Sequence, residues 1–298
     1  MGLCATGAND KPFDHLVKKH PCFNGEAHSK FGRLHLPVSP LCNIRCRFCQ
    51  RGFNKCDRRP GVSAGLLKPE EALGTVERAL ALCPQITVVG VAGPGDTLAT
   101  DHALETFRLV HARFPALIKC VSTNGLLLRE KAEALAAAGV GTVTVTMNAA
   151  DIATLARVVA HIHYNGQYMT GEMAARFLLL NQLAGIKKAV DLGLAVKVNT
   201  VLIPGVNDRQ IGDIAQAAAK AGAGFINVIP LIPQGEFKDI RPPSCLELNA
   251  AREAAEEHLP VFRHCRQCRA DACGIPGADV DFADKLYGQR FADTFSHG

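Results

Sequence analysis

A regular alternation of short apolar segments with helical ones constrains the fold most. Six segments rich in β-branched and apolar residues predict strands that are buried on both faces: residues 34–38, 85–91, 117–121, 142–147, 195–203 and 225–231. Helical sequences separate them, and Gly139, Gly193 and Gly222 follow three of the predicted helices as stop signals. This order predicts an α/β fold, an open partial (βα)6 TIM-like barrel whose chemistry gathers at the carboxyl ends of the strands.

The alternation covers only the middle of the chain, which predicts three parts. Residues 1–32 are expected to form an N-terminal extension, residues 33–235 the barrel, and residues 236–298 a C-terminal extension that carries a C-x2-C motif. The segment 161–172 is an insertion before the fourth helix. The two extensions are expected to close over the mouth of the barrel.

Charge and hydropathy exclude several classes of protein. The net charge of +5 over 298 residues and the absence of Trp do not favour a nucleic-acid partner. No apolar run reaches the length of a membrane span, and the N-terminus lacks the apolar stretch of a signal peptide. We therefore expect a cytoplasmic protein, where twelve cysteines indicate metal binding or catalysis rather than disulfides.

Three of these cysteines follow the first predicted strand with the spacing C-x3-C-x2-C: Cys42, Cys46 and Cys49. A structural zinc site takes four ligands, commonly as two C-x2-C pairs, and the second pair is missing nearby. Three thiolates on one loop suit three irons of a [4Fe–4S] cluster and leave the fourth iron open for a small molecule.

An aromatic residue, Phe48, precedes the last of these cysteines. The motif C-x3-C-x-aromatic-C after the first strand of a partial barrel resembles the hallmark of the radical S-adenosylmethionine (SAM) superfamily. The resemblance implies that the open iron chelates the amino and carboxylate groups of SAM. Reduction then cleaves the sulfonium and yields a 5′-deoxyadenosyl radical.

The same resemblance implies SAM contacts at six residues: Phe48, Gly93, Gly95, Asp96, Asn148 and Asp208. Phe48 would lie near the adenine, and the "AGPGD" turn would receive the amino group. The superfamily has a glutamate in that turn, and this chain has Asp96 instead. Asn148 would meet the ribose or the carboxylate, and Asp208 stands in the glycine motif after the fifth strand.

Other Cys and His residues exceed what a single cluster needs. Cys265 and Cys268 form a C-x2-C pair that fits zinc or an iron–sulfur cluster equally well. Taken alone, a strand cysteine such as Cys120 is more often a small buried hydrophobe than a ligand. Taken alone, His35, which alternates with two leucines of the first strand, is more typical of a hydrogen-bonded core histidine than of a ligand.

Longer stretches carry a more specific resemblance. "HPCFNGEAHSKFGRLHLPVSPLCNIRCRFCQRGFNKCDRRPGV", the "AGPGD" turn and the late "CRQCRADACG" resemble the NifB family of nitrogenase cofactor maturases. The match runs from His20 to Gly274. The chain ends soon afterwards, as in the short stand-alone form of the family without a C-terminal carrier domain.

The resemblance implies a reaction in which iron–sulfur clusters are themselves the substrates. Two [4Fe–4S] clusters are fused into an eight-iron core, a carbide from the methyl group of SAM is inserted, and one further sulfur is taken up. The product is the precursor (NifB-co) of the nitrogenase cofactor. SAM is used twice, once as methyl donor and once as the source of the radical.

The resemblance also implies two sets of substrate-cluster ligands. His35, Cys56 and Cys120 would hold one cluster, and Cys22, Cys265 and Cys268 the other. A neutral imidazole binds iron more weakly than a thiolate does, so His35 is expected to anchor one iron while the cluster is rebuilt.

The acid–base groups are less clearly indicated. Glu26 and Arg58 are candidates by their proximity to the motifs, as are His28 and Asp271. The implied partners are a cluster-donating scaffold, a cofactor-accepting carrier or maturase, and an electron donor such as a ferredoxin or flavodoxin.

Two alternatives stay open on the residues themselves. A radical SAM enzyme with permanent auxiliary clusters could act on a peptide or a small metabolite. A non-enzymatic iron–sulfur carrier or zinc scaffold would explain the cysteines, but it leaves the glycine motifs at the strand ends without a purpose.

Overall fold

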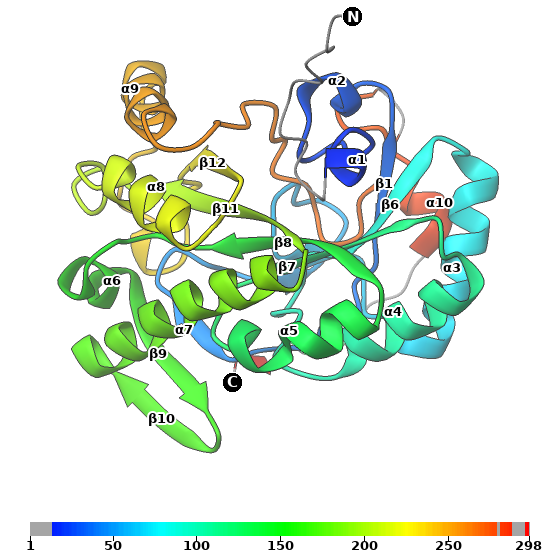
Figure 1. Cartoon of the computed structure of the whole chain (residues 1–298), viewed down its shortest axis with the longest axis horizontal. Helices are drawn as coiled ribbons and strands as arrows, with labels where there is room; N and C mark the ends of the chain where they lie inside the picture. Colours follow the sequence, from blue (N-terminus) through cyan, green and yellow to red (C-terminus); the bar gives the residue numbers. More distant parts are fainter. Residues whose placement is uncertain (1–13, 279–280, 288–295, 298) are drawn as a thin grey trace, which may run out of the picture.

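The centre of the molecule is one curled sheet, seen in Figure 1 with helices along its outer side. The computed structural model describes residues 14–278, 281–287 and 296–297. The strand order is β12-β11-β8-β7-β6-β1-β13. Its parallel strands are β1 (Gly32–His35), β6 (Ile86–Val91), β7 (Ile118–Thr123), β8 (Val140–Thr146), β11 (Ala195–Leu202) and β12 (Phe225–Pro230).

These strands are the six that the apolar segments predicted, and the partial (βα)6 barrel is confirmed. Their boundaries differ by a few residues at either end. Side chains on both faces are buried, as a parallel sheet covered by helices requires; Val88 and Val89 of β6 are examples, at 1% and 0% exposure.

The seventh strand is an addition that the sequence did not indicate. β13 (Cys273–Gly274) comes from the C-terminal segment and pairs antiparallel with β1, with Leu34 opposite Cys273. A strand of two residues has no periodicity to detect, so only tertiary pairing defines it. The pairing fixes the "CRADACG" stretch against the first strand of the barrel.

Long helices follow the parallel strands and cover the convex side of the sheet (Figure 1). They are α3 (Pro69–Leu82), α4 (His102–Arg113), α5 (Leu128–Ala137), α6 (Ile152–Val158), α7 (Gly171–Asp191), α8 (Ile211–Lys220) and α9 (Cys245–Glu256). Pro69 stands at the start of α3, and Gly139, Gly193 and Gly222 follow helix ends with positive φ, as predicted. Asn207, which precedes α8, donates its side-chain amide to the backbone oxygens of Asn148 and Val201.

The predicted insertion forms a hairpin that supports the cysteine loop. β9 (Val159–Tyr164) and β10 (Gln167–Thr170) pair antiparallel, and β9 also pairs with β3 (Ile44–Cys46). Tyr164 packs on Phe177 of α7 with ring centroids 4.6 Å apart. The hairpin therefore connects the loop to the outer helix layer.

Shorter elements complete the described part of the chain. The helices are α1 (Asp14–Val17), α2 (Gly25–His28), α10 (Ala283–Tyr287) and the 3-10 turn Gly235–Phe237. The strands are β2 (Leu41–Cys42), β4 (Gly52–Phe53), β5 (Val62–Ser63) and β14 (Ser296–His297). Val17 and Phe23 pack against Ala195 and Phe225, the first residues of β11 and β12. The N-terminal segment thus lies at the amino ends of these strands.

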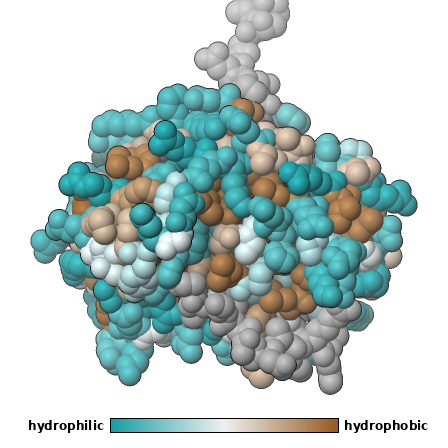
Figure 2. Space-filling view, turned by 90° about the horizontal axis from the view of Figure 1, so that it is seen from below, coloured by the Kyte–Doolittle hydropathy of each residue, from teal (hydrophilic) through white to brown (hydrophobic). Residues whose placement is uncertain are grey.

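One face of the molecule is mainly polar (Figure 2). Figure 2 shows the face seen from below, on which hydrophilic residues surround separate hydrophobic patches. No helix among the described residues is long and apolar enough to span a bilayer.

Candidate active site

The barrel encloses a cavity with a volume of about 290 Å³, which we call the barrel cavity. Inward-facing residues line it along the strands, for example Thr144 and Thr146 of β8 and Lys197 and Asn199 of β11. Most residues singled out from the sequence line it together: Cys22, His35, Cys46, Phe48, Cys49, Gly95, Asp96, Cys120, Asn148, Cys265 and Cys268. The cavity therefore brings together residues from all three predicted ligand sets.

The cysteine loop lies at the carboxyl end of β1. Burial, with the nearby thiolates of Cys49 and Cys42, raises the pKa of Cys46. Burial alone would lower the pKa of Arg51, but the thiolates of Cys42, Cys49 and Cys46 raise it above its usual value. Three sulfurs thus converge beside one guanidinium, a setting that favours a cluster carrying negative charge.

The "AGPGD" turn packs on the cysteine loop. Gly95 donates its N–H to Ser39 O at 2.8 Å, and the N–H of Asp96 donates to Leu41 O at 2.8 Å. A Cβ on Gly95 would collide with the backbone of Leu41. The close approach that requires glycine here is therefore the approach of two loops.

Asp96 is buried, and its carboxylate accepts several hydrogen bonds. Its carboxylate accepts the N–H of Asn124 at 2.6 Å, the N–H of Leu98 at 2.9 Å and the hydroxyl of Thr123 at 3.0 Å. Burial raises the pKa of this carboxyl, although these bonds oppose the shift. Asp96 holds the ends of β6 and β7 together while it lines the barrel cavity.

The remaining predicted SAM contacts are placed unequally. The Oδ1 of Asn148 accepts the N–H of Val201 at 2.9 Å, which leaves its Nδ2 group as a donor for a ligand. Asp208 accepts the N–H of Gly205 at 3.0 Å and is not among the residues that line the barrel cavity. Gly93, at φ +128°, is also outside that lining, and a Cβ added to it would lie 3.1 Å from Ala270 Cβ.

His35 is oriented by the C-terminal segment. Its Nδ1 lies 3.0 Å from the carbonyl oxygen of Arg269. A carbonyl only accepts, so Nδ1 carries the proton and Nε2 presents its lone pair. Burial, and next the charge of Arg33, lowers the pKa of His35 to about 4. The imidazole is therefore neutral near pH 7, as a metal ligand must be.

A glycine separates His35 from Cys120. The strand register places His35 opposite Gly90, and Gly90 opposite Cys120, on three neighbouring strands. A Cβ on Gly90 would lie 3.5 Å from both Cys120 Cβ and His35 Cδ2. The missing side chain therefore leaves a gap between the two predicted ligands.

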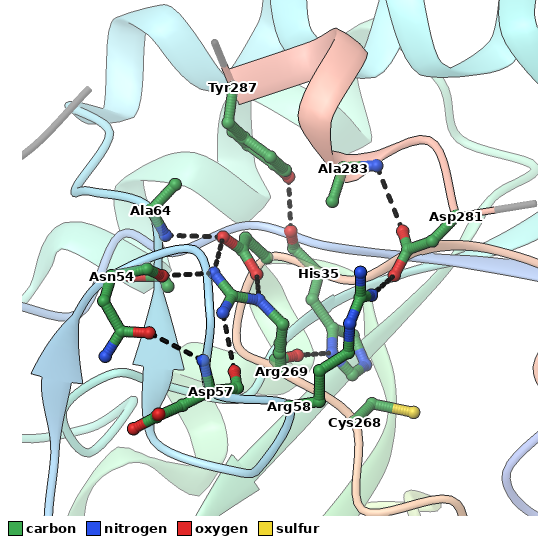
Figure 3. A network of polar contacts seen from close by, with 12 residues as sticks. His35, Asn54, Asp57, Arg58, Ala64, Cys268, Arg269, Asp281, Ala283 and Tyr287 are labelled. Carbon is green, nitrogen blue, oxygen red and sulfur yellow. Dashed lines mark hydrogen bonds and ion pairs between the residues drawn. The ribbon is translucent and has the colours of Figure 1, made fainter. Parts of the chain in front are cut away.

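Arg269 and Asp271 form a buried ion pair at 2.8 Å that organises the surrounding segments (Figure 3). Arg269 also donates to Asp57 O at 2.7 Å and to Asn54 O at 2.8 Å, while Asp271 accepts the N–H of Ala64 at 2.6 Å. Asn54 Oδ1 accepts the N–H of Cys56 at 3.0 Å. One arginine therefore clamps the turn that carries Cys56.

Cys56 itself is exposed and is not among the residues that line the barrel cavity. Its turn nevertheless shares Arg269 with His35, since the backbone oxygen of Arg269 faces the imidazole and its guanidinium holds the turn. Figure 3 shows Arg269 between His35 and the turn of Asn54 and Asp57, with the Tyr287 hydroxyl donating to His35 O.

Cys22, Cys265 and Cys268 line the other end of the barrel cavity. The buried Nζ of Lys197 donates to Cys22 O at 2.6 Å and lies 4.7 Å from the ring centroid of Phe23. Burial raises the pKa of Cys22 to about 12, although the charge of Lys197 opposes this shift. Arg33 donates to Cys268 Sγ at 3.2 Å. Two cations thus stand beside these thiols.

Comparisons with known proteins give the family. The model of the radical SAM superfamily matches residues 36–218. The FeMo cofactor biosynthesis protein NifB of Methanocaldococcus jannaschii is 47% identical over 265 residues, which are 88% of each chain. The chain belongs to the NifB family. The NifB protein of Klebsiella pneumoniae is 40% identical over 290 residues, which cover 93% of this chain and 62% of that relative.

Solved structures support the fold. A radical SAM methyltransferase from Sphaerobacter thermophilus aligns with a TM-score of 0.52 at 20% identity, covering 78% of this chain and 64% of that one. SuiB of Streptococcus suis aligns with a TM-score of 0.54 at 13% identity, covering 87% and 56%. The chain is a radical SAM enzyme, and its superfamily implies a [4Fe–4S] cluster and SAM as cofactors.

Several residues that matter in this NifB-family chain escaped the sequence reading. The buried cations Lys197, Arg33 and Arg51 gave no signal, because lysine and arginine are usually exposed. Gly90 did give a sequence signal, since a lone glycine inside a strand of β-branched residues often marks a place where a ligand or another backbone comes close.

Glu26 and Arg58, two of the four acid–base candidates, lie apart from the barrel cavity. Glu26 is exposed on α2. Arg58 faces Asp281 at 3.7 Å with 69% of its side chain exposed. Neither lines the barrel cavity, and their catalytic roles stay predictions.

Proposed function

We propose that this NifB-family chain builds the eight-iron precursor of the nitrogenase FeMo cofactor from two [4Fe–4S] clusters. A carbide derived from the methyl group of SAM and one additional sulfur complete the core. The single observation that carries the proposal is the barrel cavity, because residues from the SAM-cluster loop and from both substrate-cluster sets line one enclosed space.

Each group of residues has a distinct task in this proposal. Cys42, Cys46 and Cys49 would hold the resident cluster. When bound, that cluster and SAM supply the reductive cleavage of the sulfonium and the carbon for the carbide. Phe48, Asn148 and the backbone of the "AGPGD" turn would position SAM, and the Nδ2 of Asn148 is the donor that remains available.

The substrate clusters would be held by fewer ligands than they can accept. His35, Cys56 and Cys120 would bind one, and Cys22, Cys265 and Cys268 the other. The thiols of Cys22 and Cys120 have raised pKa values because they are buried. They are therefore protonated and weakly nucleophilic until iron displaces the proton, which suits ligands better than nucleophiles.

The buried cations supply what such clusters need. Tris-thiolate [4Fe–4S] clusters carry negative charge, and Arg51 and Lys197 lie beside the sulfurs at the two ends of the barrel cavity. An N–H donor aimed at a ligand sulfur, as Arg33 is at Cys268, stabilises the reduced cluster.

The test is activation of nitrogenase that lacks its cofactor. Anaerobically reconstituted protein, given SAM and a reductant, should release 5′-deoxyadenosine and a product that restores activity once carriers and maturation proteins are added. Release of 5′-deoxyadenosine without an activating product, together with permanent clusters bound only by cysteine, would instead indicate an enzyme acting on a peptide or metabolite.

The partners implied by this function are proteins of nitrogenase assembly. A scaffold would deliver the clusters, a carrier or maturase would accept the product, and a ferredoxin or flavodoxin would supply electrons.

A further inference from the structure

A second cavity of about 590 Å³ lies behind the predicted ligand Cys268, and we call it the basic chamber. Five cationic side chains line it: Arg33, Lys55, Arg58, Arg266 and Arg269. Three residues, Arg33, Gln267 and Cys268, line both this chamber and the barrel cavity. Cys268 therefore stands in a wall with the barrel on one side and a polar chamber on the other.

Among the described residues that line the basic chamber, positive charges outnumber negative ones once the ion pairs are set aside. Asp271 is engaged by Arg269 at 2.8 Å, and Asp281 faces Arg58 at 3.7 Å. Of the charged lining residues that the structure describes, this leaves Arg33, Lys55 and Arg266 against Asp284.

Arg33 places one of these positive charges beside the predicted ligand Cys268. Arg33 is 6% exposed, and its guanidinium donates to Gly274 O at 2.5 Å and to Cys268 Sγ at 3.2 Å. Among the described residues no carboxylate lies within 4.0 Å of it. An anion in the chamber would thus reach a charge that is already coupled to the sulfur of Cys268.

We propose that the basic chamber binds a small inorganic anion beside Cys268. Arginine and lysine recognise oxyanions through charge-assisted hydrogen bonds, and a concave wall of one sign concentrates anions from solution. On the proposed function, which this step rests on, one sulfur beyond those of the two clusters must arrive. Hydrosulfide and sulfite are both small anions of the kind that such a chamber binds. Hydrosulfide is already at the oxidation level of a cluster sulfide, whereas sulfite must first take up six electrons from the added reductant and six protons, and lose three waters.

Sulfate is the probe for the binding step, because it is redox-inert and does not ligate iron strongly. Titration calorimetry at low ionic strength should show saturable binding of one sulfate per chain. The Lys55→Gln/Arg266→Gln double variant should bind about 10- to 100-fold more weakly. The charge-retaining Lys55→Arg/Arg266→Lys variant should keep the affinity, which separates loss of charge from loss of folding.

The matched control removes two positive charges elsewhere. Arg263, paired with Glu256 at 2.7 Å, and the exposed Lys238 do not line the chamber. Arg263→Gln/Lys238→Gln should bind sulfate like the unmodified chain. Absence of saturable binding, or equal weakening in both double variants, overturns the proposal.

A second arm distinguishes the sulfur sources. Product formed with ³⁵S-hydrosulfide or ³⁵S-sulfite shows which anion supplies sulfur, and its half-saturating concentration should rise about tenfold or more in the Lys55→Gln/Arg266→Gln variant. Incorporation with an unchanged concentration dependence would remove the chamber from sulfur delivery. If no product forms in any variant, the proposed function fails. The sulfate titration then still tests whether the basic chamber binds an anion.

Discussion

The two ends of the barrel cavity are assembled in different ways. At the carboxyl end, Cys42, Cys46 and Cys49 lie on one short loop that backbone hydrogen bonds tie to the "AGPGD" turn. The other predicted ligands that line the cavity come from strands and from both chain extensions, and Cys56 lies on an exposed turn outside the lining. The first site is local in sequence, whereas the second exists only after the chain has folded.

The two ends also depend on different stabilising interactions. The cysteine loop needs few long-range contacts to bring its sulfurs together. The substrate-cluster end depends on one buried ion pair, Arg269–Asp271, and on the contact of Lys197 with Cys22 O. Substitutions should therefore damage the two ends separately.

The largest effect is expected at the local end. Cys46→Ala should abolish release of 5′-deoxyadenosine, because a cluster that lacks one of three protein ligands is not held in place. Iron content should fall by about four atoms per chain while the other clusters remain. Anaerobic iron analysis and chromatography of the nucleoside measure both.

Cys245→Ala is the matched control, since Cys245 is exposed at the start of α9 and does not line the barrel cavity. It should behave like the unmodified chain. Continued nucleoside release from Cys46→Ala would contradict the assignment of the loop.

The next effect concerns the space between His35 and Cys120. Gly90→Val should prevent binding of the cluster at His35 while SAM cleavage continues, because the added side chain occupies the gap between the two ligands. Iron should again fall by about four atoms per chain. Gly90→Ala is the graded control, because its Cβ would lie 3.4–3.5 Å from its neighbours, an ordinary contact. Full iron content in Gly90→Val would show that the cluster lies elsewhere.

The contrast also explains what the sequence could predict. Strands and helix ends follow from local patterns, so the six parallel strands and the glycines after α5, α7 and α8 were found. The triplet was readable because its three ligands are neighbours in sequence. Arg269 was not, since its partners Asn54 and Asp57 lie more than two hundred residues away and only packing brings them together.

A smaller effect, on stability, is expected from the ion pair that organises the distributed end. Arg269→Met should lower the free energy of unfolding of the metal-free protein by about 3–5 kcal/mol, because it leaves Asp271 buried and unpaired. The Arg269→Met/Asp271→Leu double variant should regain part of this loss, yet it should still bind less iron because the Cys56 turn remains unclamped. Urea denaturation and iron analysis measure the two effects.

Arg263→Met is the comparison variant for that experiment. Its partner Glu256 lies on the surface, so the expected loss is about 0–1 kcal/mol. Equal losses in Arg263→Met and Arg269→Met would mean that the buried pair does not hold the distributed end together.

The smallest effect is a pH dependence that arises at His35. Its pKa is about 4 in the folded chain, against about 6.5 in the unfolded chain. The unfolded state therefore binds more protons between these values, and stability from this group is present above pH 6.5 and lost as pH falls towards 4.

At about pH 5, unfolding of the metal-free chain should take up about one proton more than unfolding of His35→Asn. Urea titrations at closely spaced pH values measure this difference. An identical pH slope for His35→Asn and the unmodified chain would show that the imidazole is not held neutral by its burial.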